Sequence, residues 1–495
     1  MIRVLDSHTA RCLILLLAFA PACGGDDDDH DHSDGDDHAE DDHGGDDDGD
    51  DGSSALDHTL FVAREGSLVS FDLTSGDRRP GEVTLVTGPV DLQALADGML
   101  MVNLTGRDEI LVVDGRDMLE ETRMGSSANG GTRPVHSFLS PDYDGKQYWV
   151  TLNDGAGEAV QNSACFVDVT PDSETRFDMV GEVALGIGHH KASFSKTQPR
   201  MAISNISDCE DVISVYDFSD PAKVEVLATL TGAQAGFDRP DPGADNFDPF
   251  FCDPTFERGR PPAPHGCATS ALSGKAYCNL TSSGAMVAID IDAEKPTFEL
   301  LETEGDGGGY TFAHPGGRYI YTLQEAPREG AGGEVCQVGA INITDSMTDE
   351  VVASAPLGYK GADCEETLTG TPAESANPGH AYFAADGDRL FIPTSGGFDN
   401  AAARVDQLLV LDTSDPTAPV QLPSIQVGVH TSHSAAAFTG DGETLFVVNG
   451  IDGTISQVDV DSLEVTATID AGPDPRVVAT FGSEEGPSHQ TGPVE

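Results

Sequence analysis

Basic residues are scarce in this chain. Lysine and arginine together number 26 against 85 aspartates and glutamates, and the formal net charge is −59. A surface this acidic repels polyanions, so nucleic acid and anionic lipid faces are excluded as partners. Solubility in a salty medium is the plainest explanation for most of the charge.

Three other features are missing. Beyond residue 22 no segment is long and apolar enough to span a bilayer. No helical periodicity of useful length occurs, which argues against an α-helical fold. No G-x-S-x-G nucleophile motif accompanies a matched acid and base, so the sequence gives no hydrolase signature.

Residues 1–22 are typical of an export signal. Arg3 and Arg11 supply positive charge around the apolar stretch CLILLLAFA, and the segment ends in small residues. The sequence APAC resembles a bacterial lipobox with Cys23 as the lipidated residue. Because the usual leucine three positions earlier is absent, cleavage to a secreted, unlipidated form stays open. We expect an exported protein of the bacterial cell envelope, in the periplasm or at the outer membrane, which touches the membrane only through its lipid.

Residues 23–56 are expected to form a disordered linker behind that anchor. Residues 26–51 are almost entirely aspartate, glycine and histidine, with 16 acidic residues, and such a composition cannot bury a core. One interpretation is a solvated, extended spacer. The other is auxiliary metal capture, because carboxylate and imidazole groups are ligands for Zn²⁺ and similar cations. The imidazoles in question belong to His30, His32, His38 and His43.

The rest of the chain repeats one unit. Strand pairs joined by Gly/Asp turns, such as GKQYWVTLND and GETLFVVNG, precede an apolar-Asp-apolar signature. The eight signature positions are Asp72, Asp114, Asp168, Asp217, Asp290, Asn342, Asp412 and Asp459. About four short strands per unit predict an all-β fold, a single β-propeller.

The repeat also predicts how the propeller closes. The first unit lacks an inner strand, whereas the chain ends with the spare strand PRVVATF (residues 475–481), so the C-terminal strand should complete the first blade. We therefore expect eight blades over residues 57–482, with seven as the alternative, and a flexible tail at 483–495. The units VHSFLSPDYDGKQYWVTLND and HSAAAFTGDGETLFVVNG resemble YVTN-type propeller repeats.

Histidines recur where the inner strands begin. Inner strands line the central channel of a propeller, so equivalent positions should form a ring at one of its mouths. Metal binding is one interpretation, with Zn²⁺ held by three or four imidazoles and copper as the alternative ion. A packing role and catalysis without metal remain open. The predicted ring consists of His136, His189, His190, His265, His380, His430 and His433; His314 falls in a following turn and is left out.

Nine cysteines are present, of which Cys12 leaves with the leader and Cys23 would carry lipid. Outside the cytoplasm most of the remaining seven should be oxidised, and their odd number leaves at least one unpaired. Two insertions at residues 233–263 and 359–376 each carry a cysteine and should be stapled loops. From chain order, the preferred pairs are Cys165–Cys209, Cys252–Cys278 and Cys336–Cys364, although sequence does not fix connectivity.

The motifs GHHKASFS, PHGCATSALSGKAYC and RPVHSF resemble those of periplasmic zinc metallochaperones of the AztD type. In that resemblance His189, His190, His265, Cys278 and His136 match motif positions, whereas Cys267 replaces a frequent acidic residue. It implies a monomeric, non-enzymatic zinc carrier that collects metal with its Asp/His tract and passes it to the solute-binding protein of a metal importer. Two alternatives stay open: a copper- or other metal-dependent propeller enzyme, an oxidoreductase or lactonase, and a metal-free surface scaffold.

Overall fold

Short antiparallel strands are the main elements of the part of the chain that the structure describes. The computed structural model describes residues 56–86, 88–155, 162–188, 190–208, 210–235, 264–281, 285–303, 308–329, 335–360, 377–378, 380–395, 405–430 and 435–481. The predicted signal segment, Cys23, the Asp/His tract and the predicted C-terminal tail lie outside these ranges. One short 3-10 helix, η1 (Pro221–Lys223), is the only named helix among them. In the described ranges no helix has the length and apolar character needed to cross a membrane.

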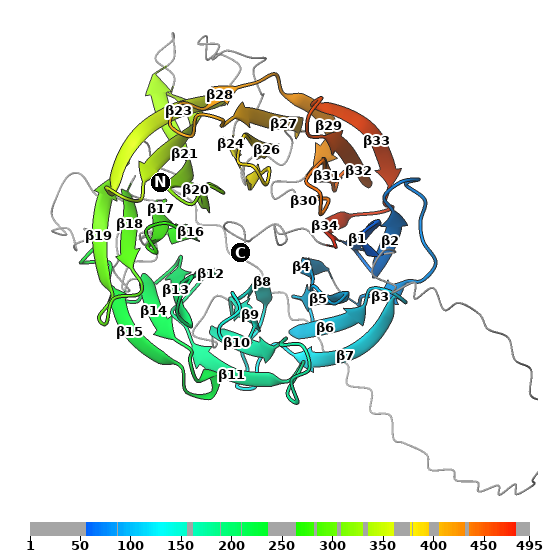
Figure 1. The fold of residues 1–495 in the computed structure, drawn as a ribbon, viewed down its shortest axis with the longest axis horizontal. Helices are drawn as coiled ribbons and strands as arrows, with labels where there is room; N and C mark the ends of the chain where they lie inside the picture. The colour runs from blue at the N-terminus through cyan, green and yellow to red at the C-terminus, as the bar shows by residue number, and fades with distance from the viewer. Residues whose placement is uncertain are drawn as a thin grey trace, which may run out of the picture. The chain divides into compact units, whose positions relative to one another are not determined.

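The strands form eight sheets arranged in a ring (Figure 1). We number the sheets as blades 1 to 8 in chain order. Blades 1 to 4 consist of β1 (Thr59–Arg64), β2 (Ser67–Asp72), β3 (Val83–Thr84) and β34 (Pro475–Thr480); β4 (Pro89–Ala94), β5 (Met99–Leu104), β6 (Glu109–Asp114) and β7 (Leu119–Gly125); β8 (Pro134–Leu139), β9 (Tyr148–Asn153), β10 (Ser163–Asp168) and β11 (Met179–Ala184); β12 (His190–Phe194), β13 (Arg200–Asn205), β14 (Ile213–Asp217) and β15 (Glu225–Leu230).

Blades 5 to 8 continue in chain order. They consist of β16 (Pro264–Thr269), β17 (Ala276–Leu280), β18 (Ala285–Asp290) and β19 (Thr297–Glu302); β20 (Gly308–Ala313), β21 (Tyr319–Glu329), β22 (Val335–Asp345) and β23 (Glu350–Lys360); β24 (Asn377–Pro378), β25 (Tyr382–Phe383), β26 (Arg389–Ser395), β27 (Val405–Asp412), β28 (Val420–Gln421) and β29 (Ile425–His430); β30 (Ala436–Phe438), β31 (Thr444–Asn449), β32 (Thr454–Asp459) and β33 (Glu464–Asp470).

The two ends of the propeller meet in blade 1. The C-terminal strand β34 pairs antiparallel with β1, with Val478 opposite Val62, and is the inner strand of that blade. Without it, the inner edge of β1 would present unpaired backbone groups to other chains. The predicted all-β propeller, its eight blades and its closure are confirmed, and the seven-blade alternative is wrong.

The signature aspartates are turn residues. Each ends the third strand of its blade and accepts a hydrogen bond from a backbone N–H two or three residues later, as Asp168 does from Thr170 at 2.9 Å. The prediction was wrong in one blade. Asp345, not Asn342, pairs with the first residue of the preceding strand and accepts the N–H of Met347 at 3.0 Å, whereas Asn342 is buried mid-strand.

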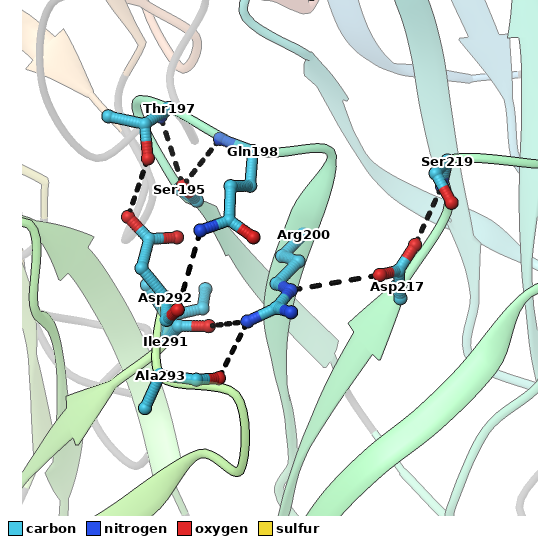
Figure 2. Close-up of polar contacts among 9 residues, drawn as sticks. All are labelled: Ser195, Thr197, Gln198, Arg200, Asp217, Ser219, Ile291, Asp292 and Ala293. Carbon is cyan, nitrogen blue, oxygen red and sulfur yellow. Dashed lines mark hydrogen bonds and ion pairs between the residues drawn. The ribbon is translucent and has the colours of Figure 1, made fainter.

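Apolar residues of neighbouring blades pack together, and polar side chains add fixed links. Between blades 4 and 5, Arg200 Nη1 donates to the backbone carbonyls of Ile291 (3.1 Å) and Ala293 (2.7 Å), as Figure 2 shows. The same figure shows Thr197 donating to the Asp292 carboxylate at 2.7 Å. These links fix the angle between neighbouring blades and therefore the positions of the inner strands.

Candidate functional site

Strand register defines one equivalent position on the inner strand of every blade, which we call the ring position. In blades 2, 3 and 4 it is the residue opposite the next-to-last residue of the second strand: Asp91 opposite Asn103, His136 opposite Leu152, and Lys191 opposite Ser204. The same register in the other blades gives a mixed ring instead of a ring of histidines. From blade 1 to blade 8 it reads Val477, Asp91, His136, Lys191, Gly266, Tyr310, His380 and Ala435.

The predicted histidines therefore do not share one position. His136 and His380 occupy it, whereas His190 and His265 each lie one residue earlier. His430 ends β29, the outermost strand of blade 7, and does not start an inner strand. A one-residue offset along a strand turns a side chain toward a different neighbour, which is why sequence alignment alone misplaced these imidazoles. His189 and His433 lie outside the described residues.

Lys191 is the unexpected member of the ring. Its side chain is buried, with only 1 % of the residue exposed. Its Nζ atom lies 3.3 Å from Nδ1 of His136 and 4.9 Å from the centre of the Tyr310 ring. Burial lowers the pKa of Lys191 to about 7, against the opposing influence of Asp91 and Asp154. The amine is thus held neutral for a larger share of the time than an exposed lysine.

Two buried carboxylates accompany this amine. Asp91 is fully buried, and its Oδ2 accepts the backbone N–H of Ser137 at 2.8 Å. Asp154 follows β9, and its Oδ1 accepts the backbone N–H of His190 at 3.3 Å. Burial raises the pKa of both carboxyls to about 7, although Lys191 acts to lower each. Buried acids and an amine that titrate near neutrality are typical of functional sites.

Blades 5 to 7 contribute a cluster of aromatic side chains at or next to the ring position. The Tyr310 ring stacks on His380 with centroids 4.3 Å apart and contacts His265 at 4.7 Å. The contact with His265 depends on Gly266, because a Cβ there would lie 2.6 Å from the backbone nitrogen of Thr311. Burial raises the pKa of the Tyr310 phenol, which therefore stays neutral at physiological pH.

Two further described histidines, His190 and His314, contact hydrogen-bonding groups of the protein itself. His190 is fully buried, with Nε2 3.4 Å from Oδ1 of Asn162. His314 was excluded from the ring by the sequence, and it indeed lies in the turn after β20. There its Nδ1 accepts the N–H of Gly316 at 3.0 Å, and its Nε2 lies 3.1 Å from the Gly387 carbonyl oxygen.

The described residues alone do not complete a metal site. No three histidine, cysteine, aspartate or glutamate side chains in the described ranges are grouped closely enough to hold an ion. His265 is half-buried, whereas His136, His190 and His380 are buried, so His265 is the most accessible imidazole of this set. The tract histidines His30, His32, His38 and His43 lie outside the described residues.

The disulfide in the structure differs from the pairs predicted from the sequence. Cys267 forms a disulfide with Cys278, joining β16 to β17 within blade 5, so the predicted Cys252–Cys278 pair is wrong. Cys165 is a buried free thiol, so the predicted pair with Cys209 is wrong as well. Cys336 lies on β22, but its side chain and Cys209, Cys252 and Cys364 lie outside the described part of the chain. Adjacent strands brought Cys267 and Cys278 face to face, which spacing along the chain did not indicate.

Sequence reasoning missed Asp91, Lys191 and Tyr310 because it searched for histidine. In five blades, a proline two residues earlier in the sequence marks the ring position. The prolines concerned are Pro89, Pro134, Pro264, Pro378 and Pro475. Proline suits the irregular start of an inner strand, where a ladder hydrogen bond is absent. Aligning on this proline would have found Asp91, although not Lys191 or Tyr310.

Comparison with known proteins supports the architecture. The structure of apo AztD from Citrobacter koseri is similar with a TM-score of 0.52 and 13% identity, covering 86% of this chain and 98% of that one. Dihydro-heme d1 dehydrogenase NirN in complex with DHE is similar with a TM-score of 0.51 and 12% identity, covering 86% of this chain and 75% of that one. The predicted resemblance to AztD-type propellers is thereby confirmed for the fold. At such identities the likeness says nothing of activity.

No protein-family model and no curated protein matches the chain. The YVTN-type label therefore stays a prediction.

Proposed function

We propose that this protein is an exported zinc carrier that holds the ion at the histidine-bearing mouth of its propeller and releases it to a transport system. The observation that carries the proposal is the pair of imidazoles that contact the Tyr310 ring near the start of the inner strands of blades 5 and 7, which face the central channel. They belong to His265 and His380. Imidazole is a preferred ligand for zinc and copper.

Charge and accessibility favour one side of this channel for the ion. In its protonated form, Lys191 beside His136 opposes a divalent cation on the side of blades 3 and 4. Blades 5 to 7 carry the half-buried His265 together with His380, and Tyr310 holds both imidazoles by ring contacts. We therefore assign His265 and His380 as zinc ligands.

The Asp/His tract supports the same function. Many weak ligands on the same chain as the propeller raise the local concentration of cations available to it. Transfer from many weak ligands to a few fixed imidazoles follows the gradient of affinity. The proposed recipient is the solute-binding protein of a metal importer, and no catalytic step is assigned to the zinc.

Equilibrium dialysis of the mature protein against Zn²⁺ tests the proposal. We expect one tight equivalent, lost in His265→Ala and in His380→Ala, and kept in His58→Ala, which removes an exposed histidine away from the channel. Removing residues 26–51 should slow uptake and leave the tight equivalent in place. Retention of that equivalent in both ring variants would overturn the assignment, and tighter binding of Cu²⁺ with redox turnover would favour the enzyme alternative.

A further inference from the structure

His314 joins two neighbouring blades through the nitrogens of its ring. It follows β20 of blade 6, and the Gly387 carbonyl that it contacts belongs to the turn between β25 and β26 of blade 7 (Figure 1). Its Nδ1 accepts the N–H of Gly316 at 3.0 Å, and its Nε2 donates to the Gly387 oxygen at 3.1 Å. An amide donor at one nitrogen and a carbonyl acceptor at the other fit only the neutral ring that carries its proton on Nε2.

The imidazole is enclosed at this junction. Only 7% of the residue is exposed, and its ring stacks on Tyr321 with centroids 5.9 Å apart and contacts Phe383 at 5.2 Å. Gly387 permits the close approach, because a Cβ there would lie 2.7 Å from Cε1 of His314. A proton on Nδ1 would point at the Gly316 N–H, and the resulting charge would be surrounded by aromatic rings. The contact between the blades therefore requires the neutral ring.

The other blades show that this turn does not need a histidine. Where the corresponding residue is serine, as at Ser195, its hydroxyl accepts N–H groups of the turn in the way that Nδ1 of His314 does. In seven blades the residue directly after the inner strand donates its N–H to a carbonyl at or next to the start of the second strand: Leu95, Ser140, Ser195, Ser270, His314, Ala384 and Thr439. Of these seven, only His314 can gain a proton near neutral pH.

We propose that His314 is an acid-sensitive latch, which holds blades 6 and 7 together at neutral pH and releases them in acid. Burial lowers the pKa of His314 below its usual value, although the Gly387 carbonyl and the Asp388 carboxylate act to raise it. The closed junction therefore favours the neutral ring. Its contribution to the closed state is full above about pH 6.5, the ordinary value for histidine, and is lost as pH falls below it.

The ionisable groups that the structure places around His314 keep their charge over this pH range. Asp388 acts on it from the turn between β25 and β26. Tyr321 faces it from β21, and burial raises the pKa of that phenol. Arg318, in the same turn as His314, forms an ion pair. Carboxylates titrate near pH 4 and the other two groups above pH 10, so His314 is the group that changes between pH 7.5 and pH 5.5.

Release of the latch acts on the side of the ring that we propose for zinc. Blade 6 also carries Tyr310, whose ring contacts His265 of blade 5 and His380 of blade 7. A looser junction between blades 6 and 7 loosens the contact between Tyr310 and His380. Acid should therefore favour release of the ion, and this consequence, unlike the latch itself, rests on the proposed function.

Hydrogen exchange on metal-free mature protein tests the latch, so the outcome does not depend on zinc binding. Deuterium uptake is followed by mass spectrometry at pH 7.5 and pH 5.5, and each rate is divided by that of an unstructured peptide to remove the chemical effect of pH. We expect protection of residues 314–317 to fall by about 10-fold at pH 5.5, because protonation of an open-state histidine multiplies the open population by that factor. Residues 195–198, capped by Ser195 at the same repeat position, should keep their protection.

A variant separates titration from a merely structural role. His314→Ser supplies the cap that other blades use and cannot gain a proton, so the difference between the two pH values should disappear from residues 314–317. Unchanged protection of this segment in wild type, or the same acid-induced loss in His314→Ser, would overturn the proposal. An equal loss at residues 195–198 would overturn it as well, because acid would then loosen the ring as a whole. The comparison of the two segments within wild type decides even where the variant fails to fold.

Discussion

The amine of Lys191 and the imidazole of His136 meet at 3.3 Å in the interior of the propeller, although 55 residues separate them in sequence. The contact exists because blades 3 and 4 present the same register position to the channel. It places Lys191, the most deeply buried basic side chain among the described residues, beside one of the predicted metal ligands. The two halves of the ring therefore differ chemically. Blades 2 to 4 carry an amine and carboxyl groups beside His136, whereas blades 5 to 7 carry imidazoles around a tyrosine.

The pH dependence of stability should depend on Asp91. Burial raises its pKa to about 7 from an unfolded value near 4, so the folded state retains a proton that the unfolded state releases between these values. The contribution of Asp91 to stability is therefore full below about pH 4 and is lost as pH rises through 7. Asp91→Asn keeps an acceptor for Ser137 and removes this loss.

Urea unfolding at pH 5 and pH 8 measures the effect. We expect the stability of Asp91→Asn relative to wild type to rise between these pH values by an amount on the order of 1–3 kcal/mol. The exposed Asp77→Asn should show no comparable change. A relative stability that falls with pH would contradict the assigned direction.

The Cys267–Cys278 disulfide should stabilise blade 5. Replacing both residues with alanine is expected to lower the free energy of unfolding by roughly 2–3 kcal/mol, because a short closed loop of the unfolded chain is released. Chemical unfolding with and without reductant measures this. Cys252→Ala serves as the control and should leave the Cys267–Cys278 linkage intact in peptide maps, and a Cys252–Cys278 peptide would contradict the structure.

The Arg200 side chain should contribute more to the free energy of unfolding than other arginines of similar exposure. Arg200→Ala leaves two carbonyl groups at the junction of blades 4 and 5 without their donor, and the expected loss is about 1–3 kcal/mol. Arg123 pairs with Glu109 and Glu120 inside blade 2, and Arg123→Ala should cost less than about 1 kcal/mol. Thermal and urea unfolding compare the two variants, and equal losses would show that the link between blades carries no special weight.

Closure by the C-terminal strand gives a prediction about truncation. Ending the chain at residue 474 removes β34, exposes the inner edge of β1 and strips Val477 and Val478 from the core. We expect aggregation or loss of cooperative unfolding. Ending it at residue 481 keeps the strand and should preserve the melting transition. Light scattering and circular dichroism distinguish the outcomes, and a soluble, cooperative 474-residue protein would show that the ring tolerates opening.

The sequence predicted the repeat correctly in seven of the eight blades. Turn-capping aspartates, alternating strands and an unpaired strand at the end of the chain are local signals, and they fixed the eight blades and the way the ring closes. The prediction failed in blade 6 because AINI resembles the signature, whereas the true turn residue, Asp345, lies three positions later. Local chemistry near a turn can be imitated by a buried strand residue when the pairing partner is unknown.

The sequence did not predict the pairing register of the inner strands. The residue that reaches the axis depends on bulges and on the first pairing of each inner strand, and a one-residue change selects Lys191 instead of His190. The partner of Cys278 was likewise decided by the strand lying beside it. Sequence alone therefore determined the propeller and the abundance of imidazole near its channel. Only the folded arrangement determined which side chains meet there, because contacts across blades join residues far apart in the chain.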